Sequence, residues 1–524
     1  MLVKTFGSAV DGINAQTITI EVNVSQGIKF YLVGLPDNAI KESQQRMISA
    51  LSNCGFHWPG KRIVINMAPA DMRKEGSAYD LPMAVGVLAG SEQMSADLLD
   101  KYIIMGELSL DGSVKPIKGA LPIAINAKEA GFEGIILPVE NTLEAAVVDG
   151  IKVYGVHNLT ETVDFLNGSR ELEQVTVDLE AEFQKTLSEN DLDFADVKGQ
   201  ENVKRALEIA AAGGHNIIMI GPPGSGKTML AKRIPSILPP LNLDEAIETT
   251  KIHSVAGKTE AGHSLMLRRP FRSPHHTISD VALVGGGTYP QPGEISLAHN
   301  GVLFLDELPE FKRTVLEVMR QPLEDRIVTI SRAKFTVEYP ASLMLVASMN
   351  PCPCGYYNHP EKECTCTPMA VQKYMSRISG PLLDRIDIHL EVTPVKFEKL
   401  ADTQPAEHSS EIQKRVIEAR KVQEKRFAKC KKIYCNAQMS SKQIREFCKL
   451  DSTCIALLKT AMEKLHLSAR AYDRIVKVAR TIADLEHSDD IQPAHIAEVG
   501  DGACNLNNAV VGTGRKMQFL HCGL

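Results

Sequence analysis

The chain has little aromatic content, little net charge and no long apolar run. Aromatic residues make up 5% of its 524 residues, tryptophan occurs once, and the formal net charge is −6. So small a negative charge excludes a global attraction to nucleic acid, and any DNA contact must come from a local basic patch or from the lining of a ring. No apolar run approaches the roughly 18 residues that a membrane span needs, and the first residues lack the apolar core of a signal peptide. We therefore expect a cytoplasmic protein without a membrane partner.

The cysteines are too sparse for a disulfide framework. Eleven cysteines in 524 residues are better explained as reduced thiols, apart from one cluster. This cluster consists of Cys352, Cys354, Cys364 and Cys366, in a loop rich in proline, glycine and tyrosine. Four thiolates can hold a structural Zn²⁺, with His359 as a further candidate ligand, although the spacing also suits a metal-free or redox-sensitive loop.

What the chain does have is an ordinary globular composition over a length that suggests several domains. Hydrophobic residues make up 44% and charged residues 23%. Residues 1–168 alternate strand-like and helical patterns, and the acid-rich residues 169–192 are typical of a linker. Residues 193–395 contain the nucleotide-binding motifs, residues 396–499 are predicted to be helical, and residues 500–524 repeatedly break helical patterns and stay uninterpreted.

A phosphate-binding loop is the most informative motif. It follows the strand-like residues 217–220 and precedes the helical residues 229–233. Glycines in such a loop allow the backbone N–H groups to point at an anion, so we expect Lys227 to reach the β and γ phosphates and Thr228 to ligate Mg²⁺. The predicted nucleotide-binding residues of the loop are Gly221, Pro222, Pro223, Gly224, Ser225, Gly226, Lys227 and Thr228.

Two carboxylates and an amide follow further buried strands. Asp306 and Glu307 end the apolar residues 302–305, and Asn350 ends residues 343–349. The carboxyl ends of parallel strands share one edge of a sheet, where the phosphates would lie. We expect Asp306 to hold Mg²⁺, Glu307 to act as general base, and Asn350 to contact the γ phosphate and the attacking water. Alternatively, the acids end a strand in a solvated turn, and Asn350 forms a turn before proline.

These motifs resemble the AAA+ ATPases, in which the amide at Asn350 is called sensor 1. The family uses an arginine from a neighbouring subunit to stabilise the transition state. The matching position is Arg385, with Arg377 as a second candidate. The resemblance also implies a sensor 2 arginine at Arg470, with Arg474 as the alternative. For each of these arginines, an ordinary ion pair is the competing interpretation.

Three longer segments narrow the resemblance. Residues 269–277, 292–300 and 350–355 are similar to the magnesium-chelatase-like branch of the AAA+ proteins, and nearly the whole chain resembles the ComM/YifB family within it. This implies an α/β fold in which an AAA+ parallel sheet with a helical lid follows an α+β Lon-protease-like domain. It further implies a homo-oligomer, with a hexamer expected, and the cofactors ATP and Mg²⁺.

The function implied by this resemblance is an ATP-driven DNA motor. Such a helicase promotes branch migration and the integration of single-stranded DNA in natural transformation and recombination, with single-stranded and branched DNA as partners. The alternative is a chelatase-type or protein-remodelling ATPase. Candidate DNA contacts are the arginines near the first insert, at residues 285–289, and two cations in a predicted hairpin at residues 327–339; a subunit interface or solvated surface is the competing interpretation. These candidates are Arg268, Arg269, Arg272, Arg332 and Lys334.

The amino-terminal resemblance raises the question of peptidase activity. Lon proteases use a serine and a lysine, which acts as the base. Ser77 lies one place away from the matching serine position, and Leu121 occupies the position of the lysine. We therefore expect a binding or assembly domain that lacks a complete dyad.

Overall fold

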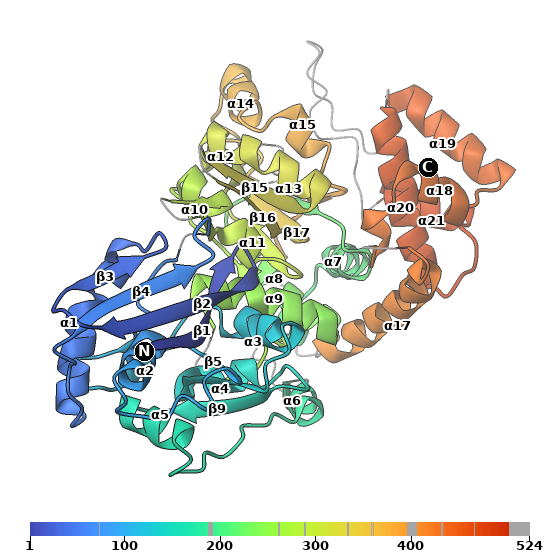
Figure 1. Cartoon of the computed structure of the whole chain (residues 1–524). Coiled ribbons are helices and arrows are strands. Elements are labelled where there is room, and N and C mark those ends of the chain that lie inside the picture. Colours follow the sequence, from blue (N-terminus) through green and yellow to red (C-terminus); the bar gives the residue numbers. More distant parts are fainter. Residues whose placement is uncertain are drawn as a thin grey trace.

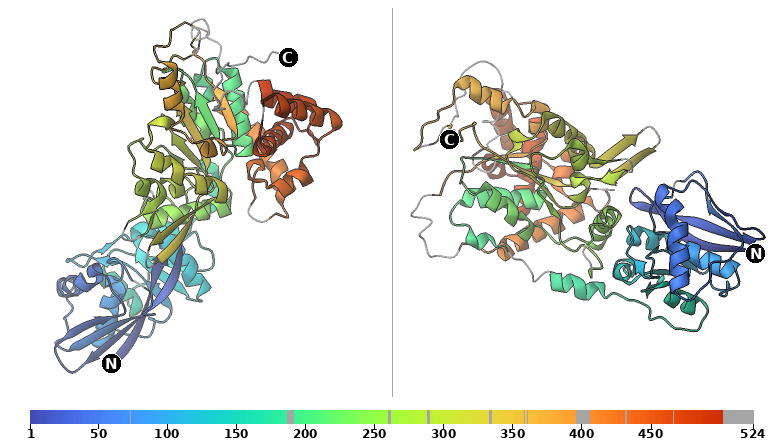
Figure 2. Two further views of the ribbon diagram at one scale, coloured as in Figure 1. Left: turned by 90° about the horizontal axis from the view of Figure 1, so that it is seen from above. Right: turned by 90° about the vertical axis from the view of Figure 1, so that its left-hand side faces the viewer.

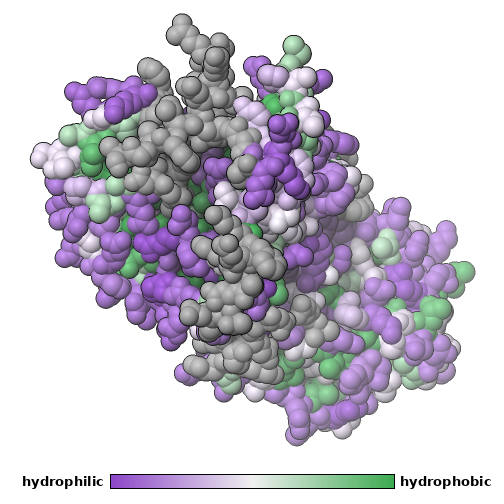
Figure 3. Space-filling view, turned by 180° about the vertical axis from the view of Figure 1, so that it is seen from behind, coloured by the Kyte–Doolittle hydropathy of each residue, from purple (hydrophilic) through white to green (hydrophobic). Residues whose placement is uncertain are grey.

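The computed structural model of the chain describes residues 1–72, 74–186, 192–259, 262–287, 290–332, 335–357, 359, 361–395, 406–430, 433–465 and 467–501. Figure 1 shows three parts along the chain: an amino-terminal sheet domain, a central sheet domain and a carboxy-terminal group of helices. Among the described residues, no helix has both the length and the apolar character to cross a membrane. The face in Figure 3 is mainly hydrophilic, with apolar residues in small separate groups.

The amino-terminal domain is built on a seven-stranded mixed sheet in the order β3-β4-β2-β1-β5-β8-β9. Alternating apolar residues bury one face of the long antiparallel pair β1–β2, whose register runs from Leu2 opposite Asn23 to Asp11 opposite Asn14. The strand-like and helical patterns expected here are thus confirmed. The elements are β1 (Leu2–Asp11), β2 (Asn14–Ser25), β3 (Phe30–Val33), α1 (Asn38–Asn53), β4 (Arg62–Ala68), α2 (Asp80–Gly90), β5 (Tyr102–Ile104), β6 (Glu107–Leu108), β7 (Val114–Lys115), α3 (Ala120–Glu129), β8 (Gly134–Pro138), α4 (Val139–Ala145), β9 (Lys152–Val156) and α5 (Leu159–Leu166).

The central domain has a five-stranded parallel sheet in the order β11-β14-β17-β10-β18. Its inner strands consist of buried apolar residues, as continuous apolar runs predict for a parallel sheet covered on both faces. The elements are α7 (Glu201–Gly213), β10 (Ile217–Ile220), α8 (Lys227–Arg233), α9 (Leu243–Ala256), β11 (Phe271–Arg272), α10 (Asp280–Val284), β12 (Gly285–Gly286), β13 (Gln291–Pro292), α11 (Glu294–Leu297), β14 (Val302–Leu305), α12 (Arg313–Val318), α13 (Arg320–Asp325), β15 (Ile327–Arg332), β16 (Phe335–Pro340), β17 (Met344–Met349), α14 (Pro368–Met375), α15 (Gly380–Leu383) and β18 (Ile388–Glu391).

The carboxy-terminal part is helical, as the sequence predicts. Ser468 caps α20 by accepting a hydrogen bond from the Ala471 N–H, and the apolar face expected after Ser468 is buried. Ser440 and Gln443 form the predicted capping box of α18. The elements are α17 (Ser409–Phe427), α18 (Ser441–Phe447), α19 (Ser452–Leu465), α20 (Ala469–Leu485) and α21 (Pro493–Asp501).

The first two domains share a hydrophobic contact, and Leu121 belongs to it. Leu121 of α3 is fully buried and clusters with Val147 and with Leu241, Ala246 and Leu265 of the central domain. Beside this cluster the Gly119 N–H donates to the Ser254 carbonyl. The segment expected as a linker contributes helix α6 (Leu179–Thr186), which packs against the same cluster through Leu179 and Phe183. Leu121 therefore helps to join the two domains.

The hairpin predicted at residues 327–339 is confirmed as β15 and β16, paired from Ile327 opposite Pro340 to Arg332 opposite Phe335. Figure 2 shows it reaching from the central sheet toward the amino-terminal domain. At this contact Ile13, in the β1–β2 turn, packs against the apolar cluster that contains Val328, Ile330 and Tyr339.

Candidate nucleotide site

Three parallel strands end together at the predicted site. β10 runs beside β17 with Ile220 opposite Met349, and β14 runs on the other side of β17 with Leu305 opposite Ala347. The chain leaves these strands at Gly221, Asp306 and Asn350. The sheet register therefore brings the phosphate-binding loop, the acidic pair and the amide to one edge, as expected for motifs that follow parallel strands.

The loop needs glycine at three positions. A Cβ on Gly221 would lie 2.2 Å from the Val392 carbonyl oxygen, so only glycine fits there. Gly224 and Gly226 have φ values of +77° and +87°, a left-handed conformation that favours glycine. Gln200, the residue that precedes α7, donates to the Ser225 carbonyl at 3.0 Å, which connects the start of that helix to the loop.

Lys227 begins α8 and points back into the loop. Its Nζ donates to the carbonyls of Gly221 at 2.7 Å and Pro222 at 2.9 Å, and to Oδ1 of Asn350 at 3.3 Å. Burial lowers the pKa of Lys227, while the charges of Asp306 and Glu307 oppose that shift. A partly desolvated ammonium among neutral acceptors gains strongly from an anion, and the arrangement suits phosphate binding.

Asp306 is held in place by two hydroxyls. Its Oδ2 accepts a hydrogen bond of 2.7 Å from Thr228 Oγ1, and its Oδ1 accepts hydrogen bonds from Ser348 Oγ and, at 3.0 Å, from the Glu307 N–H. The Thr228 hydroxyl and the Asp306 carboxylate thus adjoin each other as oxygen ligands. Such a donor set fits the hard Mg²⁺ ion that the family implies.

Glu307 is held in an uncommon backbone conformation. Its φ of 53° and ψ of 49° lie in the left-handed region, which costs roughly 1–3 kcal/mol for a residue with a side chain. Its side chain is 57% exposed, and Oε2 lies 3.7 Å from Nδ1 of His276. A glutamate turned out of the strand direction, with a solvent-accessible carboxylate, is positioned to activate water.

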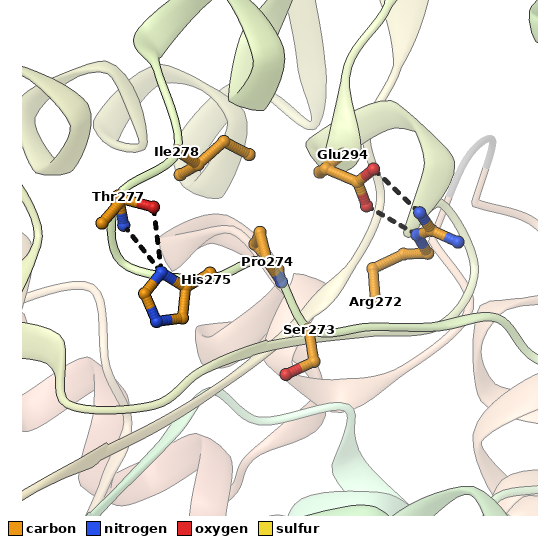
Figure 4. A pocket seen from close by; sticks show the side chains of 7 residues that line it. All are labelled: Arg272, Ser273, Pro274, His275, Thr277, Ile278 and Glu294. Atoms are coloured by element: carbon orange, nitrogen blue, oxygen red, sulfur yellow. Dashed lines mark hydrogen bonds and ion pairs between the residues drawn. The ribbon is translucent and has the colours of Figure 1, made fainter.

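His276 is a site residue that sequence reasoning missed. It lies in the loop between β11 and α10, where its ring stacks against that of His275 with centroids 4.0 Å apart. The adjacent histidines in this loop were the available signal, but only the fold brings them to Glu307. Arg272 anchors the start of the loop by donating to both carboxylate oxygens of Glu294, at 2.6 and 2.8 Å, and His275 accepts from Thr277 (Figure 4).

The candidate DNA contacts have different surroundings. Arg269 donates at 2.8 Å both to Glu245 and to the Asn300 carbonyl, and Arg272 is paired with Glu294, so both already stabilise the central domain. Arg268 is exposed. The side chain of Arg332 and the whole of Lys334 lie outside the described residues, as do Thr288 and Tyr289 of the first insert.

The structure does not bring Arg385 to the phosphate-binding loop of its own chain. The Arg385 carbonyl accepts from Asn216, which immediately precedes β10, whereas the loop follows β10. Strand β10 therefore places the amino end of the sheet, where Arg385 lies, roughly 13 Å from the carboxyl end, where the loop lies. The Arg385 guanidinium donates to Glu324 and to the Pro381 carbonyl, and its Nε is buried without a partner among the described residues.

One of the two sensor 2 candidates, Arg474, lies at that same distant end of the sheet. Arg474 donates to the carbonyls of Leu383 at 3.2 Å and Ile386 at 2.8 Å, just before β18. Arg470 is exposed and lies one turn earlier on α20. The fold therefore directs Arg474 toward the end of the sheet that carries Arg385. The second finger candidate, Arg377, instead pairs with Glu310 at 2.8 Å.

The four clustered cysteines come together beside the nucleotide site. The Sγ atom of Cys352 lies 3.3 Å from that of Cys354 and 3.7 Å from that of Cys364; these separations are close to the roughly 3.8 Å edge of a tetrahedral zinc–thiolate site. All four sulfurs lie within 4.8 Å of one another. A hydrogen bond from the Tyr356 N–H lowers the pKa of Cys354 to about 5, whereas burial and the neighbouring cysteines raise the pKa of Cys364 and of Cys366. In the metal-free cluster these shifts favour the thiolate at Cys354 and the thiol at Cys364 and Cys366.

His359 has a different role. Its Nδ1 accepts hydrogen bonds from the backbone N–H groups of Glu361 and Lys362, both at 3.1 Å, and within the described part of the chain it is not a member of the cysteine cluster. The cysteine loop also contacts the phosphate-binding loop, because a Cβ on Gly355 would lie 2.4 Å from Cδ of Pro223.

Three family models match parts of the chain, and curated relatives align with nearly all of it. Residues 193–400 match the family described as magnesium chelatase, subunit ChlI, residues 20–141 match the subunit ChlI of Mg-chelatase, and residues 406–499 match the ChlI C-terminal family. The competence protein ComM of Haemophilus influenzae is 44% identical over 95% of this chain and 96% of its own length. YifB of Escherichia coli is 45% identical over 93% and 94%.

The amino-terminal region has a more distant relative. Lon protease 2 of Bacillus subtilis is 31% identical over 127 residues, which cover 24% of this chain and 22% of that protein. This similarity is confined to a part of both chains, whereas the preceding relatives align almost from end to end. The chain belongs to the ComM/YifB family of magnesium-chelatase-like AAA+ proteins.

Proposed function

We propose that the protein hydrolyses ATP between adjacent subunits of a hexameric ring and uses the energy to promote branch migration of DNA. In this role it helps to integrate single-stranded DNA during natural transformation and recombination. The observation that carries the ATPase part is the convergence of Lys227, Thr228, Asp306, Glu307 and Asn350 at one sheet edge. The Haemophilus relative is named a competence protein, and this supports the DNA part.

The residues divide the work of phosphoryl transfer. Lys227 and the loop N–H groups bind and orient the phosphates, and the Thr228 and Asp306 oxygens would hold Mg²⁺, which neutralises phosphate charge when bound. Asn350, whose Oδ1 lies 3.3 Å from Lys227 Nζ, orients the attacking water with its amide. Glu307 accepts the proton of that water, with His276 holding its carboxylate in place.

A ring explains why the arginines lie on the far edge. Arg385 and Arg474 lie away from the phosphate-binding loop of their own chain. In a head-to-tail ring, one edge of each subunit faces the opposite edge of its neighbour. Arg385 of one subunit then completes the nucleotide site of the next subunit. Its guanidinium stabilises the negative charge that develops there in the transition state.

DNA contact is assigned to the pore side of this ring. DNA contacts that do not depend on base sequence are made by lysine and arginine side chains to the backbone phosphates. Arg332 and Lys334, at the end of the β15–β16 hairpin, and the exposed Arg268 are the candidates we retain. Arg269 and Arg272 act first as structural anchors, because each already binds a carboxylate.

We also propose that the four cysteines bind zinc and thereby stiffen the wall of the nucleotide site. The sulfur separations fit a tetrahedral site, and the same loop contacts Pro223. Metal analysis of the purified protein is expected to give about one zinc per chain. Replacing Cys352 and Cys364 by serine removes it. Full zinc content in that variant would contradict the assignment.

A strand-exchange assay tests the motor. Three-stranded DNA junctions are incubated with the protein and ATP, beside the Glu307→Gln variant and a reaction with ADP. Branch migration that requires ATP and Glu307 supports the proposal. ATP turnover that DNA does not stimulate, with no movement of the junction, favours the alternative, a chelatase-type or protein-remodelling ATPase. An Arg332→Ala, Lys334→Ala double variant separates DNA contact from nucleotide chemistry, since it is expected to keep its DNA-free turnover.

A further inference from the structure

A cavity of about 840 Å³ lies between the amino-terminal domain and the central domain. Residues 8–12 at the end of β1 and residues 75–79 line it from one side. Gln291, Val337 and Tyr339 line it from the other. Its volume lies in the range of ligand sites in proteins, and ligand sites occur preferentially between domains.

The end of β1 offers an open sheet edge to this cavity. β1 pairs with β2 along its whole length, but with β5 only at Phe6, opposite Ile103. After Ile104 the chain turns away from β1, and the Gly106 N–H donates to the Ala78 carbonyl at 2.8 Å. No strand within the described ranges therefore covers the outer edge of residues 8–11.

The direction of the free backbone groups follows from Ser8. The Ser8 N–H points away from β2, because it contacts Met105 Sδ at 3.2 Å. Backbone groups alternate along a strand, so the N–H and C=O of Val10 point to the same open side. An extended peptide laid along this edge gains main-chain hydrogen bonds, as in other complexes in which a peptide adds a strand to a sheet.

The cavity is acidic, with apolar surface between the charges. Among the described residues that line it are one lysine, Lys118, and five carboxylates. Three of these, Asp11, Asp71 and Glu75, are exposed at their positions. The carboxylates are Asp11, Asp37, Asp71, Glu75 and Glu107.

This charge excludes a phosphate backbone as the occupant and favours lysine or arginine side chains. Met72, Ile117 and Val337 supply apolar surface on both domains. Alternate side chains of an extended strand point to opposite faces, so a bound peptide can present basic residues to the carboxylates and apolar residues to these contacts.

We infer that this cavity binds an extended basic segment of a partner protein as an added strand along residues 8–11, and does not cleave it. We expect no cleavage because Leu121, at the position that the Lon resemblance gives to the base, is buried between the domains, and Ser77 Oγ donates to the Glu107 carboxylate. Since Val337 belongs to the β16 strand of the central domain, the bound segment contacts both domains. This inference does not rest on the DNA motor.

Fluorescence anisotropy with the full chain tests it. The probe is a labelled nine-residue peptide in which lysine alternates with valine, compared with a glutamate version and with a version N-methylated at alternate amides. We expect the lysine peptide to bind at least tenfold more tightly than either. Equal binding of the N-methylated peptide would overturn strand addition, and equal binding of the glutamate peptide would overturn the charge assignment.

Two protein variants locate the site. Asp11→Lys combined with Asp71→Lys is expected to weaken binding of the lysine peptide at least tenfold, whereas the exposed Asp149→Lys, outside the cavity lining, leaves it unchanged. ATP turnover checks that each variant is folded. Unchanged affinity in a folded double variant would overturn the location. Mass spectrometry is expected to recover the peptide intact, and cleavage would contradict the binding-only role.

Discussion

The position of Arg385 leads to a prediction that can be tested by mixing two inactive variants. Arg385 lies before β18, at the sheet edge opposite the loop that holds Lys227. If Arg385 serves the neighbouring subunit, Arg385→Ala and Lys227→Ala damage different halves of a shared site. Neither variant is expected to turn over ATP on its own, because one lacks charge stabilisation in the transition state and the other lacks the phosphate ligand.

The ATP turnover expected of the mixture follows from how often an interface combines an intact Lys227 with an intact Arg385. An arginine supplied across an interface is worth roughly 10³–10⁵ in rate, so each pure variant falls to background. In a ring assembled at random from equal amounts, about one interface in four pairs an intact Lys227 with an intact Arg385 from its neighbour. We therefore expect about one quarter of the wild-type turnover in the mixture if the interfaces act independently.

The assay uses two affinity tags. The variants are co-expressed, and tandem purification retains only mixed assemblies, whose steady-state ATP turnover is then measured. As a control, Arg385→Ala carried on both tagged chains stays inactive. Arg385→Lys, which keeps the charge but loses the planar fork, recovers only a part of the rate. Mixed assemblies that remain at background, or an Arg385→Ala protein with normal turnover, would refute the trans role.

Three further predictions concern single residues. Glu307→Gln should lower kcat roughly 10²–10⁴-fold while ATP stays bound, as measured by single-turnover kinetics and filter binding; normal hydrolysis would contradict the base assignment. His276→Ala should lower kcat about tenfold with little change in KM, because the imidazole positions Glu307; His276→Gln should recover part of the rate, and a change in KM alone would point to nucleotide binding instead. Leu121→Ala should lower the free energy of unfolding by about 2–5 kcal/mol because the side chain is fully buried between domains. In thermal unfolding the Tm should fall by roughly 5–15 °C. Leu110→Ala, at a residue that is 57% exposed, is the matched control and should stay close to wild type; equal Tm values would contradict the interdomain role.

The sequence predicted that the phosphate-binding loop, the acidic pair and Asn350 meet at one end of the sheet, because these motifs follow strand ends. Glycine positions, a lysine at a helix start and carboxylates after an apolar run each have a conformation that neighbouring residues largely impose. Once the strands are parallel and adjacent, their ends converge, and the contact between Lys227 and Asn350 follows. The contact between Thr228 and Asp306 follows for the same reason.

The sequence did not predict the partners of isolated residues. Leu121 was recognised only as a missing lysine, and its burial against Leu241 and Leu265 depends on how two domains pack. His276 reaches Glu307 through a loop whose path no local pattern specifies. The linker pattern concealed helix α6, because its apolar residues, Leu179 and Phe183, pack on an interdomain cluster rather than on a core of their own.

The sequence by itself determined the family, the parallel sheet and the chemistry of the phosphate-binding edge, since these depend on residue type, spacing and strand order. Only the tertiary structure decided which edge each arginine occupies, how the acidic interdomain cavity is enclosed, and where β1 is left unpaired. The physical reason is that these features depend on the packing of segments far apart in the chain, and side-chain burial and charge pairing at such contacts are set by three-dimensional proximity.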